Sequence, residues 1–568
     1  MNAQPHLISE LSTYAAIKLN ELKSHISESD IDKTSILMNV VRYFDTNFIL
    51  SKFSSEELDF DKFLHNYFIF HGYLPALSFL LCLTKDSLTL GLTKSSDASR
   101  SFAMTFLHQI GRTRIFLRHL NLAKSGMMEA SLNNDIIIFK KTERGVGIEL
   151  LDSLEDNNLN NVMINYFGDK NKPKKEMPTR LSRQMHDLVF AWRKNFIGYD
   201  TTPEIDEYFL KETIDFSKNW NNFAGIRPDF RFGPIKGKDL ILVSIALLSF
   251  YMKHLSFCFE YIKKFPGSEI DNILTIWTEK KVLIESISEF ASLPRKNVYN
   301  SLKLLSVNAK NIGQLANSYK STLPCLIDIN RRLSIRPVSS LFYDPLFFSA
   351  QELRLNNQKI WDRNTIKRED IFRNDLYGLF FGNRYITSSG AAQLKGDGRI
   401  YTDIDAAVID VETKTLALFE LKWHEPFGDN ESERLSRAIN LKRGIKKWLS
   451  SVRSFIERFG IEELARQIFQ DDHNFPQLFK VKFFVLARHH ARFSGVSFQE
   501  FSASVFCWKQ FKRMRLELGP VDDTFESLAQ DINPDMEFSN LNLRNKPIRF
   551  TVGKYQVVIE DSFFSMDD

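Results

Sequence analysis

The stretch that decides the fold of the C-terminal half is Ile400–Trp423, which reads IYTDIDAAVIDVETKTLALFELKW. It contains two runs rich in β-branched and apolar residues, Ile400–Asp410 and Thr415–Trp423, joined by a short polar connection. Runs of this kind separated by a few turn residues are typical of an antiparallel β-hairpin. We therefore expect a hairpin in which Asp410 pairs with Thr415.

Three charged side chains fall at one end of this hairpin. Side chains alternate between the two faces of a strand, so Glu420 and Lys422 should share a face. The expected pairing puts Asp405 directly opposite Glu420, with their Cβ atoms about 5 Å apart. Two carboxylates at that distance repel each other unless a cation compensates them, and Mg²⁺ prefers oxygen ligands. The two carboxylates and the backbone carbonyl of Leu421 therefore make a candidate Mg²⁺ site, beside which Lys422 would orient the attacking water or stabilise charge on a phosphate.

The segments around the hairpin alternate between helical and extended patterns. The expected elements are a helix at Thr365–Phe380, the two hairpin strands, a long helix at Glu431–Phe459, and strands at Lys480–Ala487 and Ala503–Trp508. The long helix has an apolar stripe through Leu435, Ala438, Ile439, Ile445, Leu449, Val452 and Ile456. This order of elements is typical of an α/β sandwich.

The hairpin resembles the core of the PD-(D/E)xK phosphodiesterase superfamily, which includes many restriction and repair nucleases. In that family a strand aspartate precedes a second strand that ends in Glu-x-Lys, and Asp405 with Glu420-Leu421-Lys422 matches this pattern. The resemblance covers Arg363–Leu518. It implies a restriction-endonuclease-like sandwich with a mixed central sheet, and a phosphodiesterase, in the first place a DNA endonuclease, that uses Mg²⁺ and accepts Mn²⁺.

Further site residues enter through the resemblance. Family members often add a glutamate from the helix before the hairpin, and Glu369 is the matching residue; the alternative places it on the wet side of a surface helix. The family also often places a Gln or Lys on the helix after the hairpin, where Lys442 projects within the apolar stripe. The alternative for Lys442 is a side chain that reaches back to solvent. Asp403, two residues before Asp405, departs from the usual pattern and leaves open which aspartate ligates the metal.

The first part of the chain has a different character. Apolar residues recur mostly at helical spacing, so we expect a mainly α-helical recognition or regulatory region at residues 1–320, with a sub-boundary near 152–177. The nuclease-like domain is expected at 325–520 and an extension at 521–568. Two further hairpins are expected, one at Asp135–Leu151 and one in the C-terminal stretch RFTVGKYQVVIED, turning at Gly553-Lys554. The predicted fold class is multidomain α+β.

The overall composition narrows the class of protein only slightly. A formal charge of +5 over 568 residues permits a nucleic-acid partner without requiring one. Four scattered cysteines match neither a zinc pair nor a disulfide framework, and no apolar leader follows a basic start, so we expect a cytoplasmic protein. No membrane contact is expected, because the apolar run Leu240–Met252 is too short to span and Tyr67–Leu83 is interrupted by Pro75. We expect a buried helix in the first run and two packed helical pieces in the second.

Weaker signals accompany the hairpin. Residues 282–307, VLIESISEFASLPRKNVYNSLKLLSV, resemble a helix-turn-helix that would present Arg295, Lys296 and Asn300 to a duplex. Packing of an ordinary helix pair explains the same pattern. The remaining candidates are histidines that follow predicted strands and either touch the site or end the strand: His424, His489 and His490.

These expectations support two functions from different classes. The first is a Mg²⁺-dependent nuclease, with DNA favoured over RNA, whose helical region recognises the substrate, a protein partner, a second copy of the chain or a trigger. A helical sensor joined to a nuclease resembles effectors of bacterial antiphage defence or restriction, which is an analogy of architecture. The second is a catalytically inactive protein of the same fold that acts as a nucleic-acid-binding or assembly subunit. Metal binding distinguishes the two.

Overall fold

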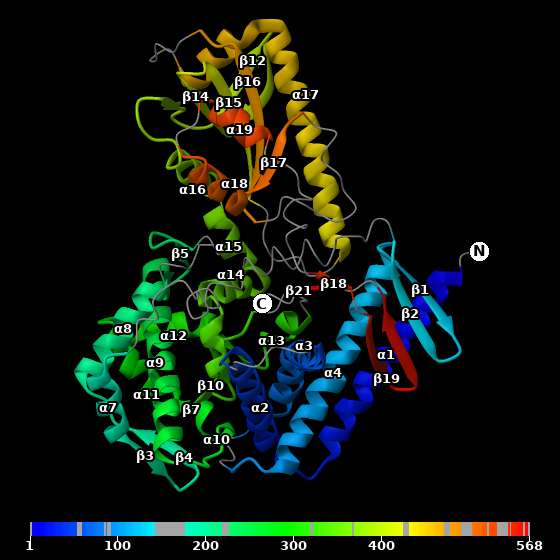
Figure 1. Cartoon of the computed structure of the whole chain (residues 1–568), viewed down its shortest axis with the longest axis vertical. Helices are drawn as coiled ribbons and strands as arrows, with labels where there is room; N and C mark the ends of the chain where they lie inside the picture. The colour runs from blue at the N-terminus through cyan, green and yellow to red at the C-terminus, as the bar shows by residue number, and fades with distance from the viewer. Residues whose placement is uncertain are drawn as a thin grey trace.

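The computed structural model describes residues 3–53, 60–84, 87, 93–142, 177–217, 226–317, 322–365, 368–423, 431–470, 477–489, 502–519, 522–530, 543–545, 547–560 and 563–565. Figure 1 shows two bodies, a larger one built mainly from helices and a smaller one built around a sheet. The protein is therefore a mixed α+β protein with a mostly helical N-terminal region, as the sequence predicts.

The helical body begins with four long helices: α1 (Ala3–Glu28), α2 (Lys33–Phe53), α3 (Phe60–Thr84) and α4 (Asp97–Lys124). α3 and α4 approach closely where each has a glycine. A Cβ on Gly72 would lie 2.1 Å from the carbonyl oxygen of Leu107, and one on Gly111 would be equally close to α3. α3 is a single helix that contains Pro75, so the predicted break into two helical pieces is wrong. The helix continues past the proline because its buried residues pack against α2 and α4, which offsets the lost backbone hydrogen bond.

α9 (Gly237–Lys264) is the central helix of this body. It packs against α7 (Thr179–Leu188), α8 (Pro203–Ser217) and α12 (Arg295–Leu304). The buried helix predicted at Leu240–Met252 is confirmed. Within the described ranges α3 and α9 are the two helices long and apolar enough to cross a membrane, and most of each apolar stretch is buried inside the body.

Short elements complete the helical body. They are β3 (Val189–Trp192), β4 (Phe196–Tyr199), β5 (Arg231–Phe232), β6 (Ile235–Lys236), α10 (Asp271–Leu274), β7 (Ile276–Glu279), α11 (Lys280–Phe290), β8 (Ser306–Val307), α13 (Ile312–Asn317), β9 (Leu326–Asp328), β10 (Leu333–Arg336), η1 (Val338–Phe342), α14 (Pro345–Asn356) and α15 (Gln358–Thr365). Leu346, Leu353 and Trp361 of α14 and α15 lie in the same core as α9. Residues 326–365 thus pack with the helical body, whereas the sequence predicts that the next domain starts near residue 325. The division into domains itself stays a prediction.

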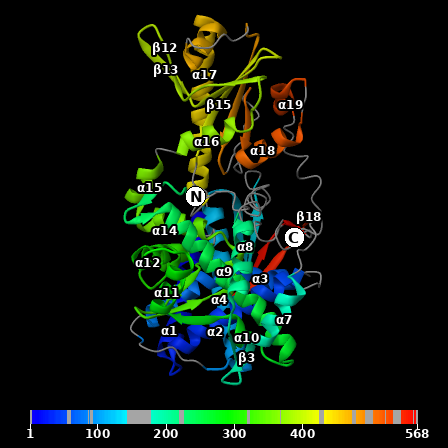
Figure 2. The same cartoon turned by 90° about the vertical axis from the view of Figure 1, so that its left-hand side faces the viewer.

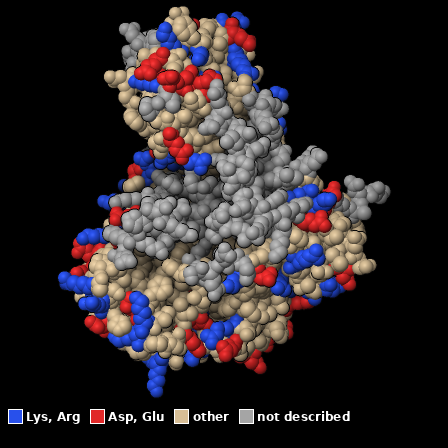
Figure 3. Space-filling view, in the orientation of Figure 1, with Lys and Arg blue, Asp and Glu red and all other residues tan. Residues whose placement is uncertain are grey.

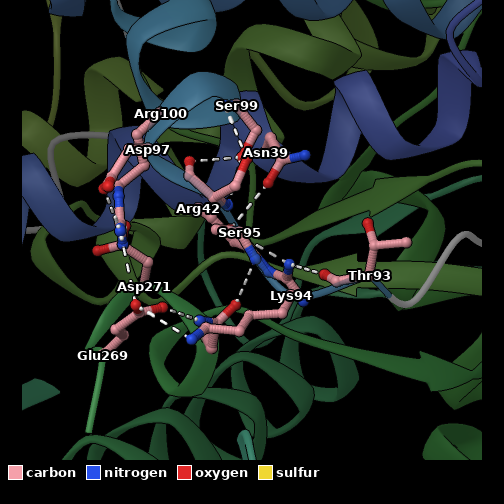
Figure 4. Close-up of polar contacts among 12 residues, drawn as sticks. Asn39, Arg42, Thr93, Lys94, Ser95, Asp97, Ser99, Arg100, Glu269 and Asp271 are labelled. Atoms are coloured by element: carbon pink, nitrogen blue, oxygen red, sulfur yellow. Dashed lines mark hydrogen bonds and ion pairs between the residues drawn. The ribbon is translucent and has the colours of Figure 1, made fainter. Parts of the chain in front are cut away.

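A polar cluster links the start of α4 to α2 and to the start of α10 (Figure 4). Arg100 bonds Asp97 at 2.7 Å and Asp271 at 3.0 Å. Arg42 of α2 donates to the carbonyl oxygen of Thr93 at 2.6 Å. Since Arg100 pairs with carboxylates and Arg42 bonds a backbone carbonyl within the cluster, we interpret the cluster as structural.

The C-terminal hairpin packs on the N-terminal part of the chain. β1 (Met128–Asn133), β2 (Ile136–Lys141), β19 (Ile548–Val552) and β20 (Tyr555–Ile559) form one sheet in the order β1-β2-β20-β19. The predicted turn at Gly553-Lys554 is confirmed. The strand at Ile136–Lys141 lies in a hairpin with the preceding β1. The second strand of the hairpin predicted at Asp135–Leu151 lies outside the described residues. The short strands β18 (Leu543–Asn545) and β21 (Phe563–Ser565), which flank the C-terminal hairpin in the sequence, pair with each other.

The smaller body is built on a five-stranded mixed sheet with the order β11-β14-β15-β16-β17. Its strands are β11 (Tyr385–Thr387), β14 (Ala406–Asp410), β15 (Thr415–Lys422), β16 (Lys480–Ala487) and β17 (Ser504–Cys507). β14 is antiparallel to both of its neighbours, β11 and β15, whereas β15, β16 and β17 run parallel to one another. The register pairs Asp410 with Thr415, as predicted. α17 (Glu431–Phe469) covers one face, and α16 (Arg368–Tyr377), α18 (Trp508–Glu517) and α19 (Thr524–Gln530) cover the other (Figures 1 and 2).

The first hairpin strand differs from the prediction. Ile400–Asp410 is not one strand but two, because the chain bends at Asp405. β13 (Arg399–Ile404) leaves the main sheet and pairs with β12 (Ala392–Gly396) in a separate ribbon. The bend places Asp405 at the point where β14 begins.

The apolar stripe of α17 agrees with the predicted one in part. Ala438, Ile445, Leu449 and Val452 are buried as predicted, whereas Ile439 is 44% exposed. Leu441, Trp448 and Phe455, which the predicted stripe left out, are also buried against the sheet. The helix bends at Gly460, where φ is +86°, next to its predicted end at Phe459.

Candidate functional site

Asp405 is held at the end of β14 by the neighbouring strand. Its Oδ2 accepts a hydrogen bond from the backbone N–H of Leu421 at 2.7 Å. The regular ladder between β14 and β15 ends at Ala406 and Phe419, and its next step would pair Asp405 with Glu420. In an antiparallel pair the N–H and C=O of one residue point to the same side. The carbonyl of Leu421 therefore points to the side on which its N–H meets Asp405.

Glu420 and Lys422 share a face, as predicted from their alternate positions. Leu416 and Leu418, which precede them at the same spacing, pack in the core beneath α17. The Lys422 Nζ lies 2.5 Å from the Glu420 Oε1. The Glu420 side chain is 11% exposed and that of Lys422 31% exposed, so the pair is only partly reached by water.

The two carboxylates destabilise each other's charge. Burial and the nearby charge of Asp405 together raise the pKa of Glu420 to about 7, although Lys422 opposes both. Burial likewise raises the pKa of Asp405, while Lys422 and the Leu421 N–H lower it. Burial lowers the pKa of Lys422, but Glu420 and Asp405 outweigh it and keep that pKa above its ordinary value. The site thus has excess negative charge that a cation would relieve.

The raised pKa of Glu420 predicts how stability depends on pH. Its ordinary value is 4.5 and its folded value about 7, so the folded protein binds more protons than the unfolded chain between these limits. This contribution to stability is complete below about pH 4.5 and is lost as pH rises through about 7. In EDTA we expect the wild type to lose on the order of 1 to 3 kcal/mol more than Glu420→Gln between pH 5 and pH 8. Unfolding by urea at the two pH values measures this; equal losses would contradict it.

Glu369 lies in the first turn of α16, exposed to solvent. Its charge nonetheless raises the pKa values of Asp405 and Glu420 and that of Lys422. The side chain is thus exposed while its charge acts on the three other groups, and its role in the site stays a prediction.

Sequence reasoning missed Arg373, which holds the backbone beside the site. This buried arginine of α16 donates to the carbonyl oxygen of Asp405 and bonds Asp370 at 2.7 Å. It follows Glu369 by about one helical turn, so both side chains lie on the same face of α16. The spacing between Glu369 and Arg373 could have been noticed in the sequence. The group that Arg373 bonds, the backbone carbonyl of Asp405, could not have been predicted from it.

Arg488 is a second missed residue. It directly follows β16, and its backbone N–H donates to the carbonyl oxygen of Lys422 at 2.8 Å. Its guanidinium lies 4.9 Å from the ring centroid of Trp423 and 5.5 Å from that of Trp508, and it bonds Asp375 at 2.8 Å. These contacts fix the end of β15 that carries Lys422. Trp423 also packs against the core of the helical body, so the site lies where the two bodies meet.

The other residues that the sequence suggested for the site are a lysine, an aspartate and three histidines. Lys442 is half-buried on α17, the helix over the face that carries Glu420, and its place in the site stays a prediction. Asp403 is exposed on β13, and its backbone carbonyl accepts from the Trp448 indole. His489 is buried beside Trp423, while the predictions for His424 and His490 lie outside the described residues.

The donor set fits a hard divalent cation. Two carboxylates and a backbone carbonyl are oxygen ligands of the kind that Mg²⁺ takes. The bonds that described residues make to the two carboxylates use Asp405 Oδ2 and Glu420 Oε1, which leaves the second oxygen of each for a cation. Within the same described residues no group of three His, Cys, Asp or Glu side chains is arranged to hold a metal, and this includes Asp405 and Glu420 with Glu369.

The charges on the surface are mixed. Figure 3 shows Lys and Arg interspersed with Asp and Glu on the visible face, without one large basic patch.

Comparison with known proteins found no match: no protein-family model, curated protein or solved structure matches the chain.

Proposed function

We propose that the protein is a Mg²⁺-dependent nuclease that hydrolyses phosphodiester bonds in double-stranded DNA. The observation that carries the proposal is the convergence of Asp405, Glu420 and Lys422 at one end of a buried hairpin, with Glu369 nearby. A five-stranded mixed sheet with α17 on one face and α16 on the other supports a restriction-endonuclease-like fold for this body.

Asp405, Glu420 and the Leu421 carbonyl would hold the cation. When bound, it would stabilise charge on the phosphate and activate the attacking water. Lys422 keeps its proton at neutral pH because of its acidic neighbours, so its ammonium would stabilise the negative charge that develops on the phosphate oxygens. Arg373 and Arg488 would keep Asp405 and Lys422 in position through the backbone. Glu369, exposed at the rim, would orient water or a second cation.

One observation favours the alternative of a catalytically inactive, nucleic-acid-binding protein. The ion pair between Lys422 and Glu420 neutralises part of the charge that would attract a cation. In the active protein the cation would bind the other carboxylate oxygen of Glu420 beside this pair, whereas in an inactive protein the pair alone would be the resting state.

Cleavage of a supercoiled plasmid tests the proposal. We expect nicked and linear products with Mg²⁺ or Mn²⁺ and none with EDTA. Without a cation the two carboxylates would repel the phosphate, and nothing would activate the attacking water. A circular substrate has no ends, so its cleavage also identifies an endonuclease. Absence of cleavage under every metal condition, or cleavage that EDTA leaves unchanged, would contradict the proposal. A role in bacterial antiphage defence or restriction is proposed by analogy of architecture alone.

A further inference from the structure

The helical body contains a helix pair followed by an antiparallel hairpin. β7 leads directly into α11, a four-residue turn joins α11 to α12, and β9 and β10 follow further along the chain. β10 pairs with β7 on one side and with β9 on the other. The strand before the helix pair and the hairpin after it therefore form one small sheet.

The turn and the core fix the direction of α12. Ser292 in the turn has φ +51°, and the Ser288 hydroxyl donates to the carbonyl oxygen of Leu293 at 2.6 Å. Val298 and Leu302 of α12 are buried in the same core as Ile287 of α11 and the residues of α9. Because one face of α12 is anchored in this way, the opposite face is turned to solvent.

That outward face is basic and carries an aromatic ring. Arg295, Lys296, Tyr299 and Lys303 are exposed, and Tyr299 keeps 45% of its surface accessible. Lys303 Nζ lies 4.8 Å from the centroid of the Tyr299 ring. Arg295 bonds Glu285 at 3.1 Å, a surface ion pair of low strength that a phosphate would replace at small cost.

The hairpin adds positive charge next to this unit. Arg331 and Arg332 are exposed in the turn between β9 and β10. Across residues 276–336 there are ten Lys and Arg and four Asp and Glu, whereas the whole chain has a formal charge of only +5. The excess positive charge of the chain is thus concentrated in this unit.

We propose that α12 is a recognition helix that enters the major groove of duplex DNA, with Arg331 and Arg332 contacting backbone phosphates. A helix of ten residues is about 15 Å long, and the major groove admits one helix across its width of about 12 Å. Lys and Arg on such a face bind phosphates and guanine edges, and Asn300, half-buried at its margin, suits an adenine edge. The inference rests on the proposed function only in taking DNA, and not an acidic protein, as the ligand.

Fluorescence anisotropy with a labelled duplex in EDTA tests this without cleavage. The variants are the helix pair Lys296→Gln/Lys303→Gln and the turn pair Arg331→Gln/Arg332→Gln. The matched control is Lys23→Gln/Lys124→Gln, which removes the same charge from exposed positions on α1 and α4. At about 50 mM salt we expect each test pair to bind about tenfold more weakly, with a salt slope smaller by about two, and the control to stay within about twofold of the wild type.

Three results would overturn the inference: no duplex binding by the wild type, unchanged binding by the helix pair, or an equal loss in the control. Thermal unfolding of each variant shows whether it is folded, which exposed substitutions should not change. Because binding is measured in EDTA, these failures leave plasmid cleavage by the wild type unaffected. Conversely, loss of binding in the helix pair together with no cleavage under any metal would contradict the proposed function alone.

Discussion

Asp405→Asn is expected to reduce Mg²⁺-dependent DNA cleavage by about 10³-fold, which is about 4 kcal/mol of transition-state stabilisation. The substitution keeps the size of the side chain and an oxygen that can accept from the Leu421 N–H. It removes the negative charge that the cation needs, so metal binding and catalysis should fall while the fold persists. Glu420→Gln should have an effect of the same size for the same reason. Rates are measured on plasmid at saturating protein.

Asp403→Asn is the matched control for this series. Asp403 lies two residues before Asp405, and its side chain is exposed. In the described part of the chain it bonds α17 through its backbone carbonyl, which accepts from the Trp448 indole. Its replacement should leave the cleavage rate within about twofold of the wild type, as is usual for surface substitutions. A large loss in Asp403→Asn with none in Asp405→Asn would reverse the assignment of the ligating aspartate. Full activity in both Asp405→Asn and Glu420→Gln would exclude this site as the catalytic one.

Lys422→Met is expected to lower the cleavage rate by about 10²- to 10³-fold without weakening the binding of metal. The ammonium acts on charge that develops in the transition state, whereas in the resting protein it competes with a cation for Glu420. Its loss should therefore separate rate from metal affinity, in contrast to Asp405→Asn. The measurement is the cleavage rate as a function of Mg²⁺ concentration.

Lys446→Met, at an exposed position on α17, controls for loss of one positive charge. If Lys422→Met lowered metal affinity and rate together, Lys422 would have a structural role in shaping the site. If it changed neither, it would not take part in the reaction.

The register of the central hairpin could be predicted because it depends on local rules. The short connection predicts that Asp410 pairs with Thr415, and the structure has that pairing. Burial alone would not have fixed the register, because both faces of β15 are buried. Glu420 and Lys422 are two residues apart, and side chains alternate between the two faces of a strand. The sequence therefore predicts that these two charged side chains share a face.

The remaining features depend on contacts between distant segments. The bend at Asp405 arises because β13 pairs with β12 and contacts α17, which no pattern within the strand reveals. Arg373 and Arg488 act on backbone atoms of other elements, so their types and positions alone do not indicate their targets. The C-terminal hairpin was predicted, but its pairing with β2 joins segments that are far apart in the chain.

Titration of the wild type and of Asp405→Asn with Mn²⁺ by calorimetry tests most directly whether the converging acids form a cation site. We expect saturable binding by the wild type at pH 8, where Glu420 is largely ionised, and binding weakened by tenfold or more in Asp405→Asn. Absence of binding heat in the wild type, or equal affinity in the two proteins, would contradict the metal-dependent site on which the nuclease proposal depends.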